Sequence, residues 1–206
     1  MKNKPFRIGF AGLYFPVMAA EENRVFEKGK AILDTLASEE SIDIVSWPKM
    51  ICETNEAVKA AAFFDEQEID FLLVQISSLI MGDTVLPLVE KFEKIGVWVL
   101  DEPTYSGDLP LNSLTGYNLF VSLVRGAWGE RKKLKWLWGM GPEFSIRLRL
   151  TIKALSTLAR IKDRTILSIG GVVPSFGNLE INADSFQASL GIHVENLELA
   201  EFFGWS

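Results

Sequence analysis

The chain has 206 residues, of which 48% are hydrophobic and 23% charged, and its formal net charge is −6 at pH 7. This composition is typical of a globular protein that is large enough for one domain, or for one domain and part of another. The acidic balance argues against nucleic acid as the main partner, because phosphate binding requires a positive surface.

Cysteine content and hydropathy predict a cytoplasmic protein with no membrane span. Cys52 is the single cysteine, so an internal disulfide cannot form, which fits a reducing compartment. The first apolar run is too short for a signal peptide, and no apolar stretch is long enough to cross a bilayer. The single histidine, His193, cannot supply a histidine-rich metal site, and its apolar neighbours are typical of a strand.

Strand-like and helix-like segments alternate in the first half of the chain. Strands are predicted at 7–12, 42–47, 69–76 and 96–100, and helices at 21–37, 54–64 and 84–94. This alternation predicts a doubly wound parallel sheet in three α/β/α layers, of the Rossmann or flavodoxin-like class. We expect Leu72 and Val99 to lie on neighbouring parallel strands, or on strands separated by one other.

The pattern changes after residue 100. We expect a loop at 101–112, a helix from Ser113 or Leu114 to Val124, no assigned element at 126–141, and a long helix at 142–161. A strand at 165–169, a helix at 183–190 capped by Asn182 or Asp184, a strand at 192–194 and a helix at 197–203 follow. The predicted domains are therefore an α/β domain at 1–141 and, at 142–206, a linking helix with a partial second α/β unit. That unit either packs onto the first or is completed by a partner subunit.

Polar residues follow the predicted strands, at the edge where open parallel sheets bind ligands. Carboxylates at this edge could hold a divalent metal or act as acid and base, although loop charges and helix caps are commoner roles. They are Asp83, Asp101, Glu102 and Asp108. The glycine-rich run 170–177 could present backbone N–H groups to a phosphate or sugar oxygen, or it could be a structural turn.

Positive charge and tryptophan are concentrated between Arg125 and Arg164. Such a segment could bind anions or nucleic acid. The acidic net charge favours a different interpretation, a solvated helix face together with an interface to acidic surface on another subunit.

Several short segments, taken in their order along the chain, resemble segments of a known protein family. They are Ile8-Gly9-Phe10 with Phe15-Pro16, Glu53 to Ala57, Ile69 to Val74, Leu111 to Gly116, and Ile169-Gly170-Gly171 with Pro174 to Gly177. In this order the chain resembles the N-terminal domain, and the start of the second domain, of the L-fucose/L-arabinose isomerase family. The resemblance implies manganese-dependent aldose–ketose isomerisation in trimers or hexamers, where the N-terminal domain of one subunit covers the active site of its neighbour. The substrate-binding positions it implies are Leu13, Tyr14, Ser77, Ser78, Asn112, Thr115 and Gly116.

The family carries its metal ligands in later domains, and His193 matches none of those ligand positions. The resemblance therefore implies no catalytic residue and no Mn²⁺ ligand in this chain, which would cover a monosaccharide but be inactive alone. A separately encoded catalytic subunit would complete the enzyme. The alternative is a non-catalytic sugar-binding or oligomer-forming α/β protein. The six tryptophans fit that alternative, since aromatic residues are common at interfaces and on sugar-stacking surfaces.

Overall fold

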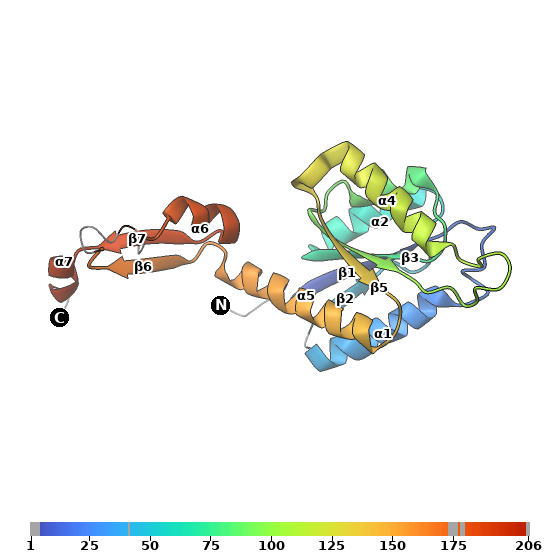
Figure 1. Ribbon diagram of the computed structural model, residues 1–206, viewed down its shortest axis with the longest axis horizontal. Coiled ribbons are helices and arrows are strands. Elements are labelled where there is room, and N and C mark those ends of the chain that lie inside the picture. Colours follow the sequence, from blue (N-terminus) through green and yellow to red (C-terminus); the bar gives the residue numbers. More distant parts are fainter. Residues whose placement is uncertain (1–4, 41, 173–176, 178–179, 205–206) are drawn as a thin grey trace. The chain divides into compact units, whose positions relative to one another are not determined.

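A computed structural model describes residues 5–40, 42–172, 177 and 180–204, and it divides into two compact units, Met1–Leu150 and Thr151–Ser206. The first unit is built on a parallel five-stranded sheet with the strand order β2-β1-β3-β4-β5 (Figure 1). The strands are β1 (Arg7–Leu13), β2 (Asp43–Ser46), β3 (Phe71–Ile76), β4 (Lys94–Val99) and β5 (Lys133–Trp138).

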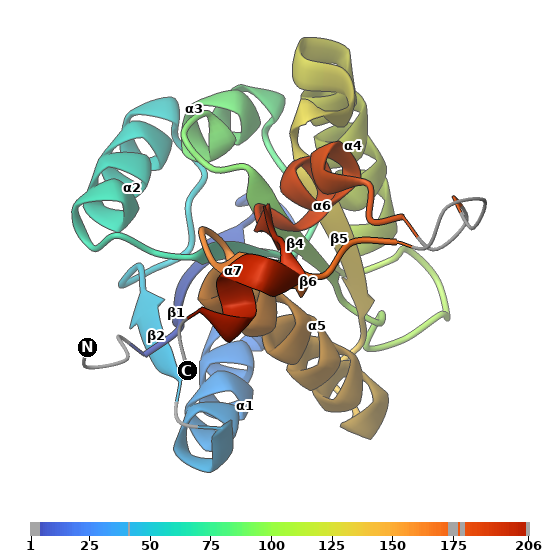
Figure 2. The same cartoon turned by 90° about the vertical axis from the view of Figure 1, so that its left-hand side faces the viewer.

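Helices cover both faces of this sheet. They are α1 (Val25–Glu40), α2 (Thr54–Glu66), α3 (Val85–Val89), α4 (Ser113–Trp128) and α5 (Pro142–Ile161), with short 3₁₀ turns η1 (Gly82–Thr84) and η2 (Gly129–Arg131). Helices α2, α3 and α4 lie on one face, and α1 and the first half of α5 lie on the other (Figure 2). The predicted three-layer, doubly wound sheet is thereby confirmed. Within the described residues, no helix combines the length and the apolar character needed to cross a membrane.

Strand β3 is the centre of the sheet, and all six of its residues are buried. In the pairing of β3 with β4, Leu72 lies opposite Ile95 and Ile76 opposite Val99, so the expected neighbourhood of Leu72 and Val99 is confirmed. A strand covered by helices on both faces is apolar along most of its length, here at every position except Gln75, which explains why its sequence lacks a period of two.

Stacked aromatic rings hold the layer formed by α1 and α5. Phe10 of β1 stacks on Phe26 of α1 with ring centroids 5.0 Å apart, and Trp98 of β4 stacks on Phe144 of α5 at 4.0 Å. The Trp98 indole nitrogen also donates a hydrogen bond to the Gly139 carbonyl oxygen at 2.6 Å. These contacts fix the chain where it leaves β5 and enters α5.

The predicted count of four strands in the first unit is wrong, because β5 occupies part of the unassigned stretch 126–141. This edge strand alternates Lys133 and Lys135 with larger apolar residues, and both lysines are exposed. Charged side chains protect edge strands from pairing with other chains. The same charges obscure the apolar pattern that identifies a strand buried on both faces.

Several predicted elements have different bounds. The strand expected at 192–194 runs from His193 to Leu197, so the helix expected at 197–203 begins at Leu199. Two helices of the first unit also differ. The helix expected at 21–37 begins at Val25, because Arg24 has a left-handed backbone with φ of 50°. The helix expected at 84–94 is shortened to Val85–Val89. The buried Lys132 ammonium donates hydrogen bonds to the carbonyl oxygens of Val89 and Glu90 and so ends that helix. The chain then enters β4 at Lys94, two residues earlier than expected.

The second unit holds a two-stranded parallel sheet of β6 (Thr165–Ile169) and β7 (His193–Leu197), with helices α6 (Ala183–Leu190) and α7 (Leu199–Phe203). Asn182 caps α6, since its side-chain oxygen accepts a hydrogen bond from the Ser185 amide at 2.9 Å. Gly170 and Gly171 follow β6 with left-handed φ angles of 84° and 64°, and the chain bends at Gly170. Pro174, Ser175 and Phe176 of the predicted glycine-rich loop lie outside the described residues.

Candidate functional site

The carboxyl ends of three strands are tied together beneath the start of α4. The Ser113 hydroxyl donates to the Ile76 carbonyl oxygen at 2.6 Å and accepts from the Leu100 amide at 3.0 Å. The Ser77 amide donates to the Leu13 carbonyl oxygen at 2.8 Å. The residues after β1, β3 and β4 therefore form one fixed edge. The sequence predicted Ser113 as a helix start and gave no sign of this bridging role.

Buried polar side chains below this edge hold its loops in place. The Ser77 hydroxyl donates to Gln75 Oε1 at 2.9 Å, and Gln75 Nε2 donates to the Val25 carbonyl oxygen at 3.2 Å. The Ser78 hydroxyl accepts from the Phe15 amide at 3.0 Å and donates to the Leu79 carbonyl oxygen at 2.8 Å. Ser78 thus fixes the loop that carries Tyr14. A glutamine inside an otherwise apolar strand was the sequence signal for this network.

Tyr14 is half-buried at the end of β1. Its hydroxyl donates to Glu21 Oε1 at 3.0 Å, and its amide donates to the Ile51 carbonyl oxygen at 3.1 Å. Burial, with hydrogen bonding to Glu21 and Cys52, raises the pKa of Tyr14 above its usual value of 10.0. The phenol is therefore neutral at pH 7 and acts as a hydrogen-bonding group rather than as a base.

The start of α4 supplies the other wall of the edge. Asn112 has a left-handed backbone with φ of 52°, and its side-chain oxygen accepts from the Thr115 hydroxyl at 2.6 Å. Glu102 accepts from the amides of Leu111 at 2.9 Å and Ser113 at 3.3 Å, which gives this helix terminus a carboxylate.

Gly116 lets α4 approach the strand ends. A Cβ atom at this position would lie 2.6 Å from the Ser78 carbonyl oxygen and 2.7 Å from Ile76 Cγ2. Such distances are closer than real side chains tolerate, so only glycine permits this packing.

The seven substrate-binding positions implied by the resemblance fall into two groups. Four of them, Leu13, Ser77, Ser78 and Gly116, are buried and support the edge from below. Three of them, Tyr14, Asn112 and Thr115, are half-buried or exposed. A phenol, an amide and a hydroxyl can bind the hydroxyl groups of a neutral polyol. Their role in substrate binding stays a prediction.

The acidic residues noted in the sequence are separated by the fold. Asp83 accepts from the Thr54 hydroxyl at 2.7 Å, Asp101 accepts from the Trp138 indole nitrogen at 2.5 Å, and Asp108 lies in an exposed loop. Among the described residues, no group of three or more histidine, cysteine, aspartate or glutamate side chains is placed to hold a metal ion. The described residues therefore do not fit a Mn²⁺ site.

Several cations of the basic segment form contacts within the chain. Arg149 of α5 pairs with Glu39 and Glu40 of α1, and Lys132 lies over the Trp128 ring at 4.7 Å from its centroid. Burial lowers the pKa of Lys132. His193 lies in β7 and is exposed, as a strand residue. Part of the positive charge is thus used in internal packing.

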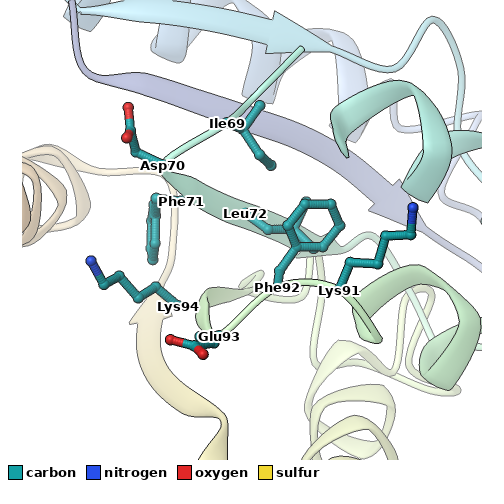
Figure 3. A pocket seen from close by; sticks show the side chains of 8 residues that line it. All are labelled: Ile69, Asp70, Phe71, Leu72, Lys91, Phe92, Glu93 and Lys94. Atoms are coloured by element: carbon teal, nitrogen blue, oxygen red, sulfur yellow. The ribbon is translucent and has the colours of Figure 1, made fainter. Parts of the chain in front are cut away.

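A cavity of about 220 Å³ opens at the amino ends of β3 and β4, the opposite edge of the sheet (Figure 3). Phe71, Leu72 and Phe92 are buried at its base. Asp70 already accepts from the Arg7 amide at 2.8 Å, and Lys91 pairs with Asp65. In Figure 3 the Asp70 and Lys91 side chains lie on opposite sides of the group of residues that lines the cavity. This arrangement favours the carboxyl edge as the functional site.

Comparison with known proteins supports a relation to sugar isomerases. Over 139 residues, 66% of this chain, the sequence is 27% identical to the sulfoquinovose isomerases of Priestia aryabhattai and Priestia megaterium. The matched stretch covers 30% of the length of each relative. No family model matches the sequence. The resemblance inferred from short segments is thus supported for sugar isomerases in general, and not for the fucose and arabinose enzymes in particular.

Proposed function

We propose that the first unit covers the sugar in the active site of an aldose–ketose isomerase, while the metal ligands and the catalytic residues come from outside residues 1–206. The partner is a catalytic polypeptide or another subunit of an oligomer. The observation that carries the proposal is the similarity to sulfoquinovose isomerase, a sugar isomerase, combined with the polar edge formed by Tyr14, Asn112 and Thr115.

The edge suits a covering role because its parts are fixed before any ligand arrives. Ser78 holds the Tyr14 loop, Glu102 and Ser113 hold the start of α4, and Gly116 closes the gap between them. A preformed set of hydrogen-bonding groups loses little conformational entropy on binding. Covering a sugar also removes water from the reacting atoms, which strengthens the electrostatic interactions of the catalytic groups.

The substrate class follows from the chemistry of the edge and from the relatives. The hydroxyl and amide groups of the edge can bind the hydroxyl groups of any sugar, neutral or anionic. The candidate sugars are therefore sulfoquinovose, from the relatives' name, and L-fucose or L-arabinose, from the resemblance of the short segments. Weak affinity is expected for the chain alone, on the order of millimolar, since it supplies one side of the site.

The proposal is tested by titrating the purified chain with these three sugars and following backbone amide resonances by NMR. We expect Tyr14 and Thr115 to shift, and Tyr14→Phe to weaken binding about fivefold because one hydrogen bond is lost. Tyr105→Phe is the matched control, since Tyr105 is a loop residue that is 73% exposed. Saturable shifts elsewhere only, or equal effects of the two substitutions, would contradict the proposal.

A second candidate function is assembly without turnover, as an oligomer-forming or sugar-binding α/β protein. It is favoured by apolar side chains on β6, where Ile166, Leu167 and Ile169 are 36%, 42% and 42% exposed. Sedimentation velocity tests it directly. A purified chain that stays monomeric over the accessible concentration range would rule out self-assembly and leave the covering role.

A further inference from the structure

A second cavity, of about 180 Å³, opens at the carboxyl end of β4 beside the start of α1. None of its lining residues is among the seven substrate-binding positions implied by the resemblance, which form the covering edge: Leu13, Tyr14, Ser77, Ser78, Asn112, Thr115 and Gly116. Its lining includes Asn23, Val25, Lys28, Leu100, Asp101 and Met140. All of these residues belong to the first unit.

Asp101 is held in one position at the rim of this cavity. Its Oδ1 atom accepts from the Trp138 indole nitrogen at 2.5 Å. Gly139, with φ of 73°, passes so close that a Cβ atom there would lie 2.8 Å from Asp101 Oδ2. The Gly139 amide donates to the Val99 carbonyl oxygen at 2.8 Å, which fixes the segment that contacts Asp101. A carboxylate fixed in this way is a preorganised acceptor for ligand hydroxyl groups.

The lining also includes a cation, Lys28, and a side-chain amide, Asn23. Lys28 is exposed on α1, and among the described residues it takes part in no ion pair within 4.0 Å. Asn23 uses its side-chain nitrogen to donate to the Ala19 carbonyl oxygen at 2.7 Å. Its side-chain oxygen is the group that remains for a ligand.

The floor of the cavity is apolar and rigid. Val25, Leu100 and Leu111 are at most 5% exposed, so they present a packed surface without polar groups. Sites for small molecules commonly combine such a floor with a few fixed polar groups. A cavity of about 150 Å³ accepts benzene, so a volume of about 180 Å³ can enclose part of a sugar-sized molecule.

We propose that this cavity binds a small polyhydroxylated anion, such as a sugar acid or a sugar phosphate. Hydroxyl groups of the ligand donate to Asp101, and its anionic group lies beside Lys28. A lining that contains both a carboxylate and an ammonium group favours a molecule that carries hydroxyl groups and an anionic group. None of the seven positions lines this cavity, although Leu100 and Leu111 also take part in the contacts that hold the same edge of the sheet. The anionic group of the ligand goes beyond the sugar hydroxyls that the proposed function assigns to Tyr14, Asn112 and Thr115.

The experiment follows the methyl resonance of Met140 in protein labelled with ¹³C-methyl methionine, assigned with Met140→Leu; the chain has five methionines. The probes are D-gluconate, D-glucose 6-phosphate, neutral D-glucitol and inorganic phosphate. We expect the Met140 signal to shift with the first two, and binding of glucitol and of phosphate to be at least about tenfold weaker. The comparison of gluconate with glucose 6-phosphate distinguishes a carboxylate ligand from a phosphate ligand.

Substitutions of Lys28 and Asp101, each paired with a control, test the two charged groups. Lys28→Met is expected to reduce the affinity for both sugar anions to that for glucitol, whereas Lys30→Met on the same helix leaves it unchanged. Asp101→Asn keeps an oxygen for Trp138 and is expected to weaken all polyhydroxylated probes about tenfold, whereas Asp108→Asn has no effect. A Met140 signal that moves with no probe, or equal effects of a substitution and its control, would overturn the proposal. The Tyr14 and Thr115 amides report separately on the covering edge, so either proposal can fail alone.

Discussion

Strands β3 and β6 carry similar apolar sequences but lie in different surroundings. Leu73 of β3 is completely buried between two layers of helices, whereas Leu167 of β6 is 42% exposed in a two-stranded sheet. A two-stranded sheet on its own is marginally stable in water. An apolar run therefore predicts a strand whose side chains are buried by another element. It does not show whether that element belongs to the same chain.

The largest expected effect comes from trimming one leucine in each strand. Leu73→Ala should reduce the free energy of unfolding by about 2–5 kcal/mol, because it leaves a cavity in the core. Leu167→Ala should cost less than about 1 kcal/mol, because much of that side chain is already in water. Urea denaturation, followed with separate probes for the two units, measures both. Equal losses would show that β6 is as well packed as β3.

Two glycines of α4 sharpen the contrast between packed and open surface within the first unit. Gly116→Ala should destabilise by about 1–3 kcal/mol, since the new methyl group would overlap the Ser78 carbonyl oxygen. Gly126→Ala meets no atom within 4 Å and should stabilise by up to about 1 kcal/mol through helix propensity. Thermal unfolding of the two variants is the measurement. A stable Gly116→Ala protein would contradict the close approach of α4 to the strand ends.

Helix α6 of the second unit has no buried residue, so its N-terminal cap is expected to contribute a large part of its stability. Asn182→Ala should cost about 1 kcal/mol, because the Ser185 amide loses its hydrogen-bond acceptor. Asp184→Ala is the control and should cost about 0.3–0.5 kcal/mol through the helix dipole alone. Amide hydrogen exchange in α6 measures the difference. Equal protection in the two variants would assign the capping role elsewhere.

The smallest effect concerns the pH dependence contributed by Lys132. Its pKa is lowered in the folded state, so the unfolded chain binds more protons between that lowered value and the usual 10.5. Stability relative to Lys132→Met should therefore rise as the pH increases towards 10.5. Parallel denaturation of the wild type and Lys132→Met at several pH values isolates this contribution from other groups. A difference that stays constant or falls with pH would contradict the burial of the ammonium group.

Hydrophobic periodicity predicted the fold of the first unit, apart from β5. The helix at 142–161 and the strand at 165–169 have the bounds expected from the sequence, because a proline at the first helical position and flanking charges mark their ends. Strand β5 escaped prediction because the lysines of an edge strand break the apolar run. Apolar patterns therefore predict strands that are buried on both faces more reliably than strands at the edge of a sheet.

The candidate site was predictable as a place and not as a set of contacts. The resemblance implied Tyr14 and Ser78 as site residues, and the rule that parallel sheets bind ligands at their carboxyl edge points to the same place. The contacts of Tyr14 with Glu21, and of Ser113 with Ile76 and Leu100, join segments whose meeting depends on the register of the sheet. A single sequence contains no information on such tertiary contacts.

The most direct test of the account is an assay of the purified chain, supplied with Mn²⁺ and with sulfoquinovose, L-fucose or L-arabinose, for formation of the corresponding ketose. We predict no ketose above that of a sample without protein, because the proposed function places the catalytic groups outside residues 1–206. Sustained turnover that co-purifies with the chain and is lost on its removal would contradict the covering role.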